Sequence, residues 1–82
     1  MLNVTLKQLR YFESLSRHGH FGRAANHCSV TQPALSMQIR DLEVTLGSTL
    51  IEKGSRPFKL TAFGQLFAKS IGPILRSIEG LG

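Results

Sequence analysis

The fold is decided by residues 30–47, which read VTQPALSMQIRDLEVTLG. Thr31 is a good N-cap, Pro33 falls in the first turn, where its missing N–H costs nothing, and Gly47 is a typical residue to follow a helix. The apolar side chains that share one helical stripe are Leu35, Ile39, Leu42 and Leu46. The stretch therefore predicts an amphipathic helix between Thr31 and Gly47.

Two shorter helices are expected before it. Residues 5–17 repeat apolar side chains every three positions, and Thr5 and Gln8 have the spacing of a capping box. Gly19 ends this helix, and residues 21–27 form a second, short one. The Ala-Ala pair within the second helix is small enough to let another helix approach closely.

Residues 49–60 differ from the helices. Residues 50–53 and 58–60 are short strand candidates, and Gly-Ser-Arg-Pro at 54–57 is typical of a turn. The pattern predicts a small two-stranded hairpin, a wing, with Arg56 at its tip.

A last helix is expected over residues 61–82. Thr61 is its N-cap, and Gly72-Pro73 should interrupt and kink it, because proline removes a backbone hydrogen bond. Residues 1–60 supply three helices and the wing. The predicted fold class is therefore mainly α, a winged helix-turn-helix followed by a long C-terminal helix.

This last helix carries more apolar side chains than one helix leaves in water. Those beyond Gly72-Pro73 are expected to project past the core, and a second copy of the helix is the simplest cover for them. We therefore predict a homodimer. Its seam is expected to contain Phe63, Leu66, Phe67, Ile71, Ile74, Leu75 and Ile78.

Composition limits the function. The chain has 82 residues, a net charge of +5 and one cysteine. It is too short for a second domain, cannot form an internal disulfide, and favours an anionic partner such as nucleic acid, a membrane surface or an acidic protein. No Walker loop, HExxH, GxSxG or CxxC motif is present. We therefore expect no enzyme activity and no catalytic residue, and neither a metal nor a cofactor. We also expect no membrane segment and a cytoplasmic location.

Residues 21–40 suit a helix-turn-helix, in which the second helix enters the major groove of DNA. Gln32, Ser36 and Arg40 are spaced by four and share one polar arc. Gln32 can bond to adenine, and Arg40 to a phosphate or a guanine. Arg56 in the turn is expected to touch the DNA backbone.

Other interpretations of the same residues stay open. A polar arc on an amphipathic helix is often only a solvated face, and an arginine in a turn is often only a solvated charge. His18, His20 and His27 lack acidic or thiol partners at ligand spacing, so they are expected to be loop and cap residues. The alternative function is a helix-mediated dimerisation or interaction module that does not bind DNA.

Three blocks in order carry a family resemblance. They are FGRAA at 21–25, VTQPALSMQIRDLE at 30–43 with Leu-Gly at 46–47, and LIEK at 50–53 with LTAFG at 60–64. They resemble the N-terminal domain of LysR-type transcriptional regulators. Cys-Ser-Val at 28–30 and Leu-Ser-Met-Gln-Ile at 35–39 are most similar to the peroxide-sensing branch.

The resemblance implies sequence-specific binding of promoter or operator DNA by a bacterial regulator. It implies a homodimer formed by the linker helix, a possible tetramer of the full-length protein, and a C-terminal effector-binding domain that this chain lacks. Met37 stands where many relatives carry a basic residue. The residues to which the resemblance assigns DNA contact are Phe21, Arg23, Thr31, Gln32, Pro33, Ser36, Met37, Arg40 and Arg56.

Overall fold

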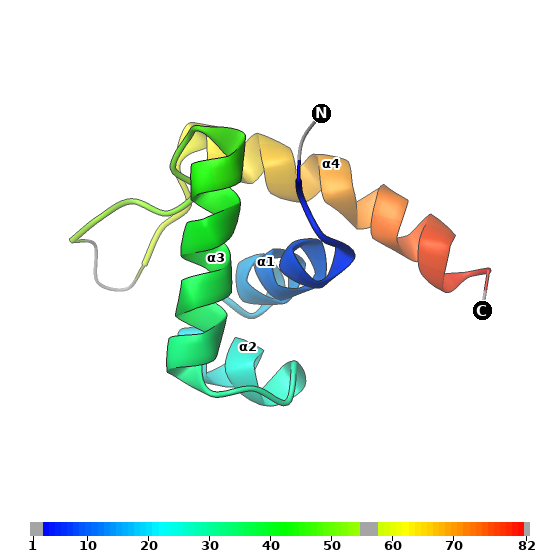
Figure 1. The fold of residues 1–82 in the computed structure, drawn as a ribbon, viewed down its shortest axis with the longest axis horizontal. Helices are drawn as coiled ribbons and strands as arrows, with labels where there is room; N and C mark the ends of the chain where they lie inside the picture. Colours follow the sequence, from blue (N-terminus) through cyan, green and yellow to red (C-terminus); the bar gives the residue numbers. More distant parts are fainter. Residues whose placement is uncertain (1–2, 55–57, 82) are drawn as a thin grey trace.

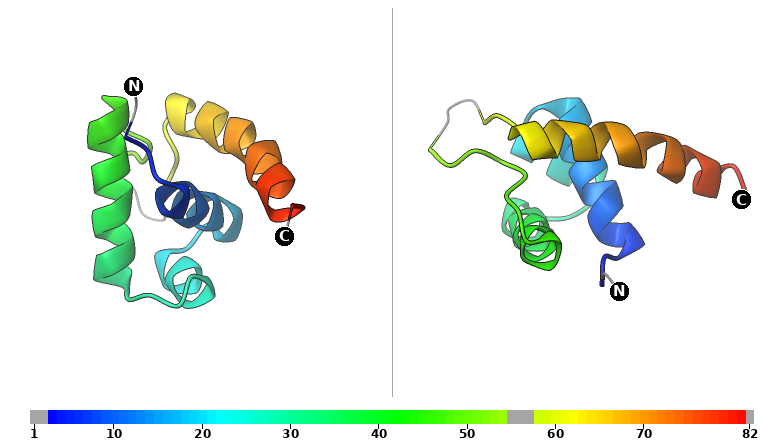
Figure 2. Two further views of the ribbon diagram at one scale, coloured as in Figure 1. Left: turned by 45° about the vertical axis from the view of Figure 1, so that its right-hand side comes forward. Right: turned by 90° about the horizontal axis from the view of Figure 1, so that it is seen from above.

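A computed structural model describes residues 3–54 and 58–81. They form four helices, in agreement with the mainly α prediction. These are α1 (Leu6–His18), α2 (Phe21–His27), α3 (Gln32–Leu46) and α4 (Ala62–Glu79). α1 lies between α3 and α4, and α2 crosses near the N-terminal end of α3 (Figures 1 and 2).

The helix starts follow the predicted caps. The N–H of Gln8 donates to Oγ1 of Thr5 at 3.0 Å, and the N–H of Thr5 donates to Oε1 of Gln8 at 3.1 Å, which completes the capping box. Thr31 caps α3 and Thr61 caps α4 through the same kind of bond. Gly47 follows α3 with a φ of 71°, in the left-handed region that glycine adopts without strain.

The core gathers around α1. Phe12 and Leu15 are fully buried, and they pack with Leu35 and Leu42 of α3 and with the Ala-Ala pair of α2. Phe67 of α4 adds its ring 5.8 Å from that of Phe12. These contacts fix the two helices of the helix-turn-helix against a common support.

α4 is one continuous helix through Gly72 and Pro73, so the expected interruption is absent. Ile71 and Leu75 belong to the chain's own core and are 3% and 4% exposed. The expectation that the side chains beyond Pro73 project past the core is therefore wrong for Leu75. The reason is that α4 packs across α1 (Figure 2), and the burial of Ile71 and Leu75 on both sides of Pro73 keeps the helix continuous.

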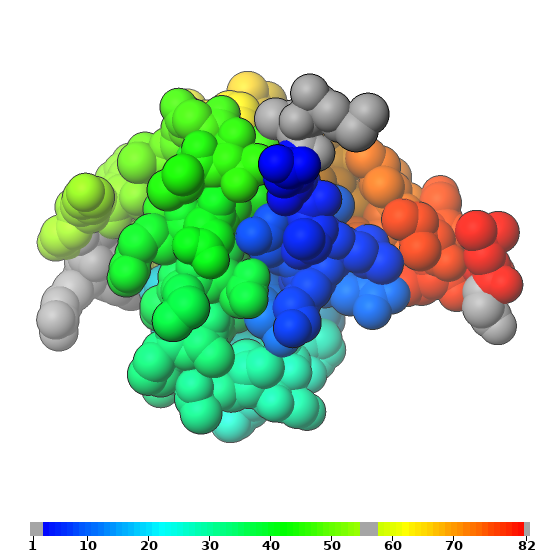
Figure 3. Space-filling model, viewed as in Figure 1, coloured from blue at the N-terminus to red at the C-terminus, as the bar shows by residue number. Residues whose placement is uncertain are grey.

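The last turns of α4 do extend beyond the other helices, at one end of the longest dimension of 38 Å (Figure 3). None of the helices in the described ranges is long and apolar enough to span a membrane.

The 49–60 loop does not contain the two predicted strands in its described part. A single antiparallel bridge pairs Ile51 with Leu60, and the N–H of Glu52 donates to the carbonyl of Lys59 at 2.9 Å. This bond belongs to the same bridge, and one bridge is too little to build a regular two-stranded sheet. The tip of the expected wing, with Arg56, lies outside the described residues.

Candidate nucleic-acid interface

One arc of α3 faces solvent from the first turn onward. Gln32, Pro33 and Arg40 are exposed, and Met37 is 57% exposed. Ser36 is half-buried in the same arc. The opposite stripe of the helix is the buried one, so the packing of α3 presents these five side chains together, as the sequence predicts.

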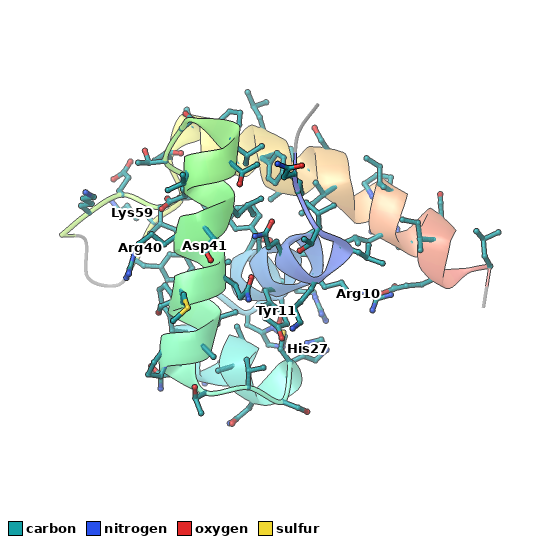
Figure 4. The ribbon with its side chains drawn as sticks, viewed as in Figure 1. Arg10, Tyr11, His27, Arg40, Asp41 and Lys59 are labelled. Atoms are coloured by element: carbon teal, nitrogen blue, oxygen red, sulfur yellow. The ribbon has the colours of Figure 1, made fainter. Side chains whose placement is uncertain are left out.

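Basic side chains flank this arc on the side of the 49–60 loop. Arg40 and Lys59 lie on the same side of α3 (Figure 4). Beside the C-terminal half of α3, a shallow hollow of about 500 Å³ is lined by Arg40, Lys53, Ser48 and Thr49, among others. The carboxylate of Glu43 also lines the hollow, but its Oε2 accepts from two backbone N–H groups, which leaves two cations and two hydroxyls for a phosphate group. Nothing in the sequence pattern had pointed to Lys53, Ser48 or Thr49 as part of this surface.

Glu43 is a positioning residue that the sequence analysis missed. Its Oε2 accepts from the backbone N–H of Leu50 at 2.7 Å and from that of Ile51 at 3.2 Å. The carboxylate thereby fixes the start of the 49–60 loop to α3. A signal was available in the sequence, because a carboxylate near a helix C-terminus is unfavourable for the helix dipole and needs another role.

Gly64 and Thr61 fix the other end of the loop. A Cβ on Gly64 would fall on the carbonyl oxygen of Leu50, so only glycine allows the first turn of α4 to approach so closely. The hydroxyl of Thr61 donates to the carbonyl of Thr49 at 2.7 Å and accepts from the N–H of Gly64 at 2.9 Å.

Phe21 has a packing role. Its half-buried ring stands edge-on to Phe58, with centroids 5.4 Å apart, and so connects α2 to the 49–60 loop. Arg23 is exposed, as is Thr31, whose hydroxyl accepts from the N–H of Ala34 at 3.2 Å. Arg56 lies outside the described residues, so its contact stays a prediction.

The histidines bond to the ends and side chains of α1 and α2 rather than forming one ligand cluster. His20 caps α2, and both His18 and His27 reach the side chain of Ser14, the closer through Nδ1 of His27 at 3.0 Å. Within residues 3–54 and 58–81, no three His, Cys, Asp or Glu side chains come together in a way that could hold a metal ion.

Known protein families and solved structures similar to this chain agree with a helix-turn-helix. Residues 6–65 match the model of the bacterial regulatory helix-turn-helix proteins of the lysR family. The chain belongs to this family. It is 51% identical over 61 residues to the SDS degradation transcriptional activation protein of a Pseudomonas strain, covering 74% of this chain and 20% of that protein. It is 41% identical over 78 residues to the transcriptional dual regulator OxyR of Escherichia coli, covering 95% and 26%.

Among solved structures, the BenM DNA-binding domain in complex with benA site 1 DNA superposes with a TM-score of 0.90. That domain is 37% identical, and the match covers 95% of this chain and 91% of the BenM chain. The chain spans about a quarter of the length of the curated relatives it matches. A hydrogen peroxide-inducible genes activator of Pectobacterium carotovorum is also 41% identical over 78 residues, yet the SDS activator has the higher identity over its shorter match, so the comparisons do not single out the peroxide-sensing branch.

Proposed function

We propose that this chain binds double-stranded DNA sequence-specifically, with the N-terminal half of α3 in the major groove. The observation that carries this proposal is the exposed arc from Gln32 to Arg40, held out by a core that buries the opposite stripe. An α-helix with its side chains is about 10–12 Å wide, which fits a major groove about 12 Å wide. Gln32, in the first turn, is placed to bond to a base edge.

Phosphate contacts would set the register of this helix. Arg40, Lys53 and Lys59 surround the arc on the loop side, and the predicted contact of Arg56 would add to them. The similarity to a domain solved in complex with DNA supports the binding of duplex DNA. In this assignment, Glu43 holds the loop in place and reads no base, while the DNA contact of Phe21 stays a prediction beside its packing against Phe58.

Selection from a random duplex library tests the proposal. The chain is expected to enrich one sequence class, and its affinity for the enriched duplex should fall steeply as salt rises. Lack of any enrichment, with an affinity that does not depend on salt, would contradict the assignment.

A homodimer through α4 is the second part of the proposal. After Ile71 and Leu75 are assigned to the chain's own core, the exposed remainder of the predicted seam shares one flank of α4. Phe67 is half-buried between the core and this flank. A second copy would cover the flank and place two α3 helices on two half-sites. The residues of this flank are Phe63, Leu66, Ile74 and Ile78.

The rival function is an interaction module that dimerises without binding DNA, and the same apolar flank favours it. The two functions differ in one observable: only the proposed one gives a salt-dependent affinity for duplex DNA. Neither function requires a catalytic group. The relatives are named as transcriptional regulators or activators, which favours the DNA-binding function.

A further inference from the structure

A groove lies on the side of the molecule away from the exposed arc of α3. α1, the C-terminal end of α2 and the second half of α4 enclose it, and its volume is about 750 Å³. Figure 4 places three of its lining residues, Arg10, Tyr11 and His27, on the other side of α3 from Arg40 and Lys59. The groove is therefore separate from the proposed DNA surface.

The rim of this groove carries an excess of positive charge. Two of its cations are engaged: Arg17 pairs with Glu13 at 3.2 Å and Arg10 with Glu79 at 3.9 Å. The other two, Lys7 and Arg76, have no carboxylate within ion-pair distance in the described part of the chain. The charged rim residues are Lys7, Arg10, Arg17 and Arg76 against Glu13 and Glu79.

The length and floor of the groove indicate what fits it. Lys7 and Arg17 stand ten positions apart on α1, about 15 Å along its axis. A single small anion cannot contact cations over that distance, whereas three turns of a helix can. Between the cations lie the half-buried ring of Tyr11 and the buried side chain of Leu75. A basic rim with an apolar floor complements an acidic amphipathic segment.

A second copy of this chain does not suit the groove. On average, the four residues of the apolar flank of α4 lie about 160° around the helix axis from the four α4 residues that line the groove, Gly72, Leu75, Arg76 and Glu79. A dimer through that flank leaves the groove open. The outer surface of α4 is also more basic than acidic, so a second α4 would meet like charge.

We propose that this groove binds an acidic amphipathic helix of a separate partner protein. Carboxylates of the partner would pair with Lys7 and Arg76, and its apolar side chains would pack on Tyr11 and on Leu6, which is 37% exposed and also lines the groove. The proposal does not depend on the proposed DNA binding, because the two surfaces share no residue.

A designed peptide tests this proposal. The probe is a helical peptide of about fifteen residues with glutamates on one face and leucines on the other. It is titrated into isotope-labelled chain, and backbone amide shifts locate the binding. Perturbations are expected at Tyr11, Cys28 and Gly72. Reversing two rim charges, in Lys7→Glu with Arg76→Glu, should weaken binding about tenfold.

The matched control reverses two charges outside the groove, in Lys59→Glu with Lys69→Glu, and should leave the affinity for the peptide nearly unchanged. Both variants are first checked for unaltered thermal unfolding. Equal weakening in both variants would overturn the proposal. So would equal affinity for a peptide with lysine in place of glutamate, equally tight binding of succinate, or shifts confined to the apolar flank of α4.

Discussion

Oε2 of Glu43 accepts a hydrogen bond from the backbone N–H of Leu50, with 2.7 Å between oxygen and nitrogen, and this bond joins the C-terminal half of α3 to the 49–60 loop. The same oxygen reaches the N–H of Ile51 at 3.2 Å. The proposed DNA surface takes residues from both α3 and the loop, so its geometry depends on this contact. Arg40 on the helix and Lys53 on the loop line one hollow because Glu43 fixes the distance between their elements.

Replacing Glu43 should loosen the loop. Glu43→Ala leaves two backbone N–H groups without their partner, and we expect a loss of about 1–3 kcal/mol in the free energy of unfolding. Hydrogen exchange at the amides of Leu50 and Ile51 should accelerate more than exchange within α1. The control is Glu52→Ala, which removes an exposed carboxylate of the same loop and should do neither. Unchanged exchange in Glu43→Ala would show that the loop is fixed by other contacts.

Gly64→Ala should be strongly destabilising. The added Cβ would fall on the carbonyl oxygen of Leu50, and backbone cannot yield as a flexible side chain can. We expect a loss of about 1–3 kcal/mol or more in denaturant unfolding. The matched control is Gly72→Ala in the same helix, where the nearest atom is the mobile end of Arg76 at 3.4 Å. Alanine there gains up to about 1 kcal/mol in helix propensity but crowds the ring of the following Pro73, so its net effect on stability should be small. If both substitutions stabilise the chain, the close approach of α4 to Leu50 is refuted.

The exposed flank of α4 should control association. Ile74 is 52% exposed and Ile78 is 38% exposed, so aspartate at both positions should not disturb the core. We expect Ile74→Asp with Ile78→Asp to give a monomer in sedimentation at tens of micromolar, a range in which we expect the intact chain to be a dimer. Gln65→Asp, on another side of the helix, should stay dimeric. A monomeric intact chain, or a dimeric double variant, would exclude this seam.

The basic side chains near α3 should act mainly on the phosphates. Lys53→Ala should weaken binding about equally on all duplexes and lower the salt slope by roughly one unit. Arg56→Ala is expected to behave in the same way, because a basic turn can touch backbone but has no group that reads a base. Titrations at several salt concentrations measure the slope. Loss at a single base pair with an unchanged slope would instead assign base contact to these residues.

Local signals made the helices predictable. Thr5, Thr31 and Thr61 cap helices through bonds to residues three positions further on. Such contacts join residues close in the sequence, so the local sequence predicts them. The exposed arc of α3 followed from the same periodicity, because the stripe of Leu35 and Leu42 fixes which side is buried.

Long-range contacts account for what the sequence did not predict. The strand-like residues of the 49–60 loop are held by Glu43 and Gly64, which lie outside the loop. Hydrogen bonds between the two halves of the loop therefore contribute little to its conformation. In α4, apolar side chains cover two neighbouring arcs. Periodicity alone does not tell which of the two arcs packs against α1. The structure shows that Leu75 belongs to the buried arc. Phe21 was assigned to DNA by resemblance, whereas its contact with Phe58 depends on the tertiary fold.

The central claim is that the first turn of α3 reads a base. It is tested most directly by how much the preference for selected over random duplex DNA falls when the Gln32 side chain is removed. Affinities of the intact chain and of Gln32→Ala are measured on the selected duplex and on random duplex at one salt concentration, with Gln65→Ala as the control. If Gln32 reads a base, its removal should cost about 1–3 kcal/mol on the selected duplex and much less on random DNA. Equal losses on both duplexes, or no loss on either, would contradict base reading by the first turn of α3.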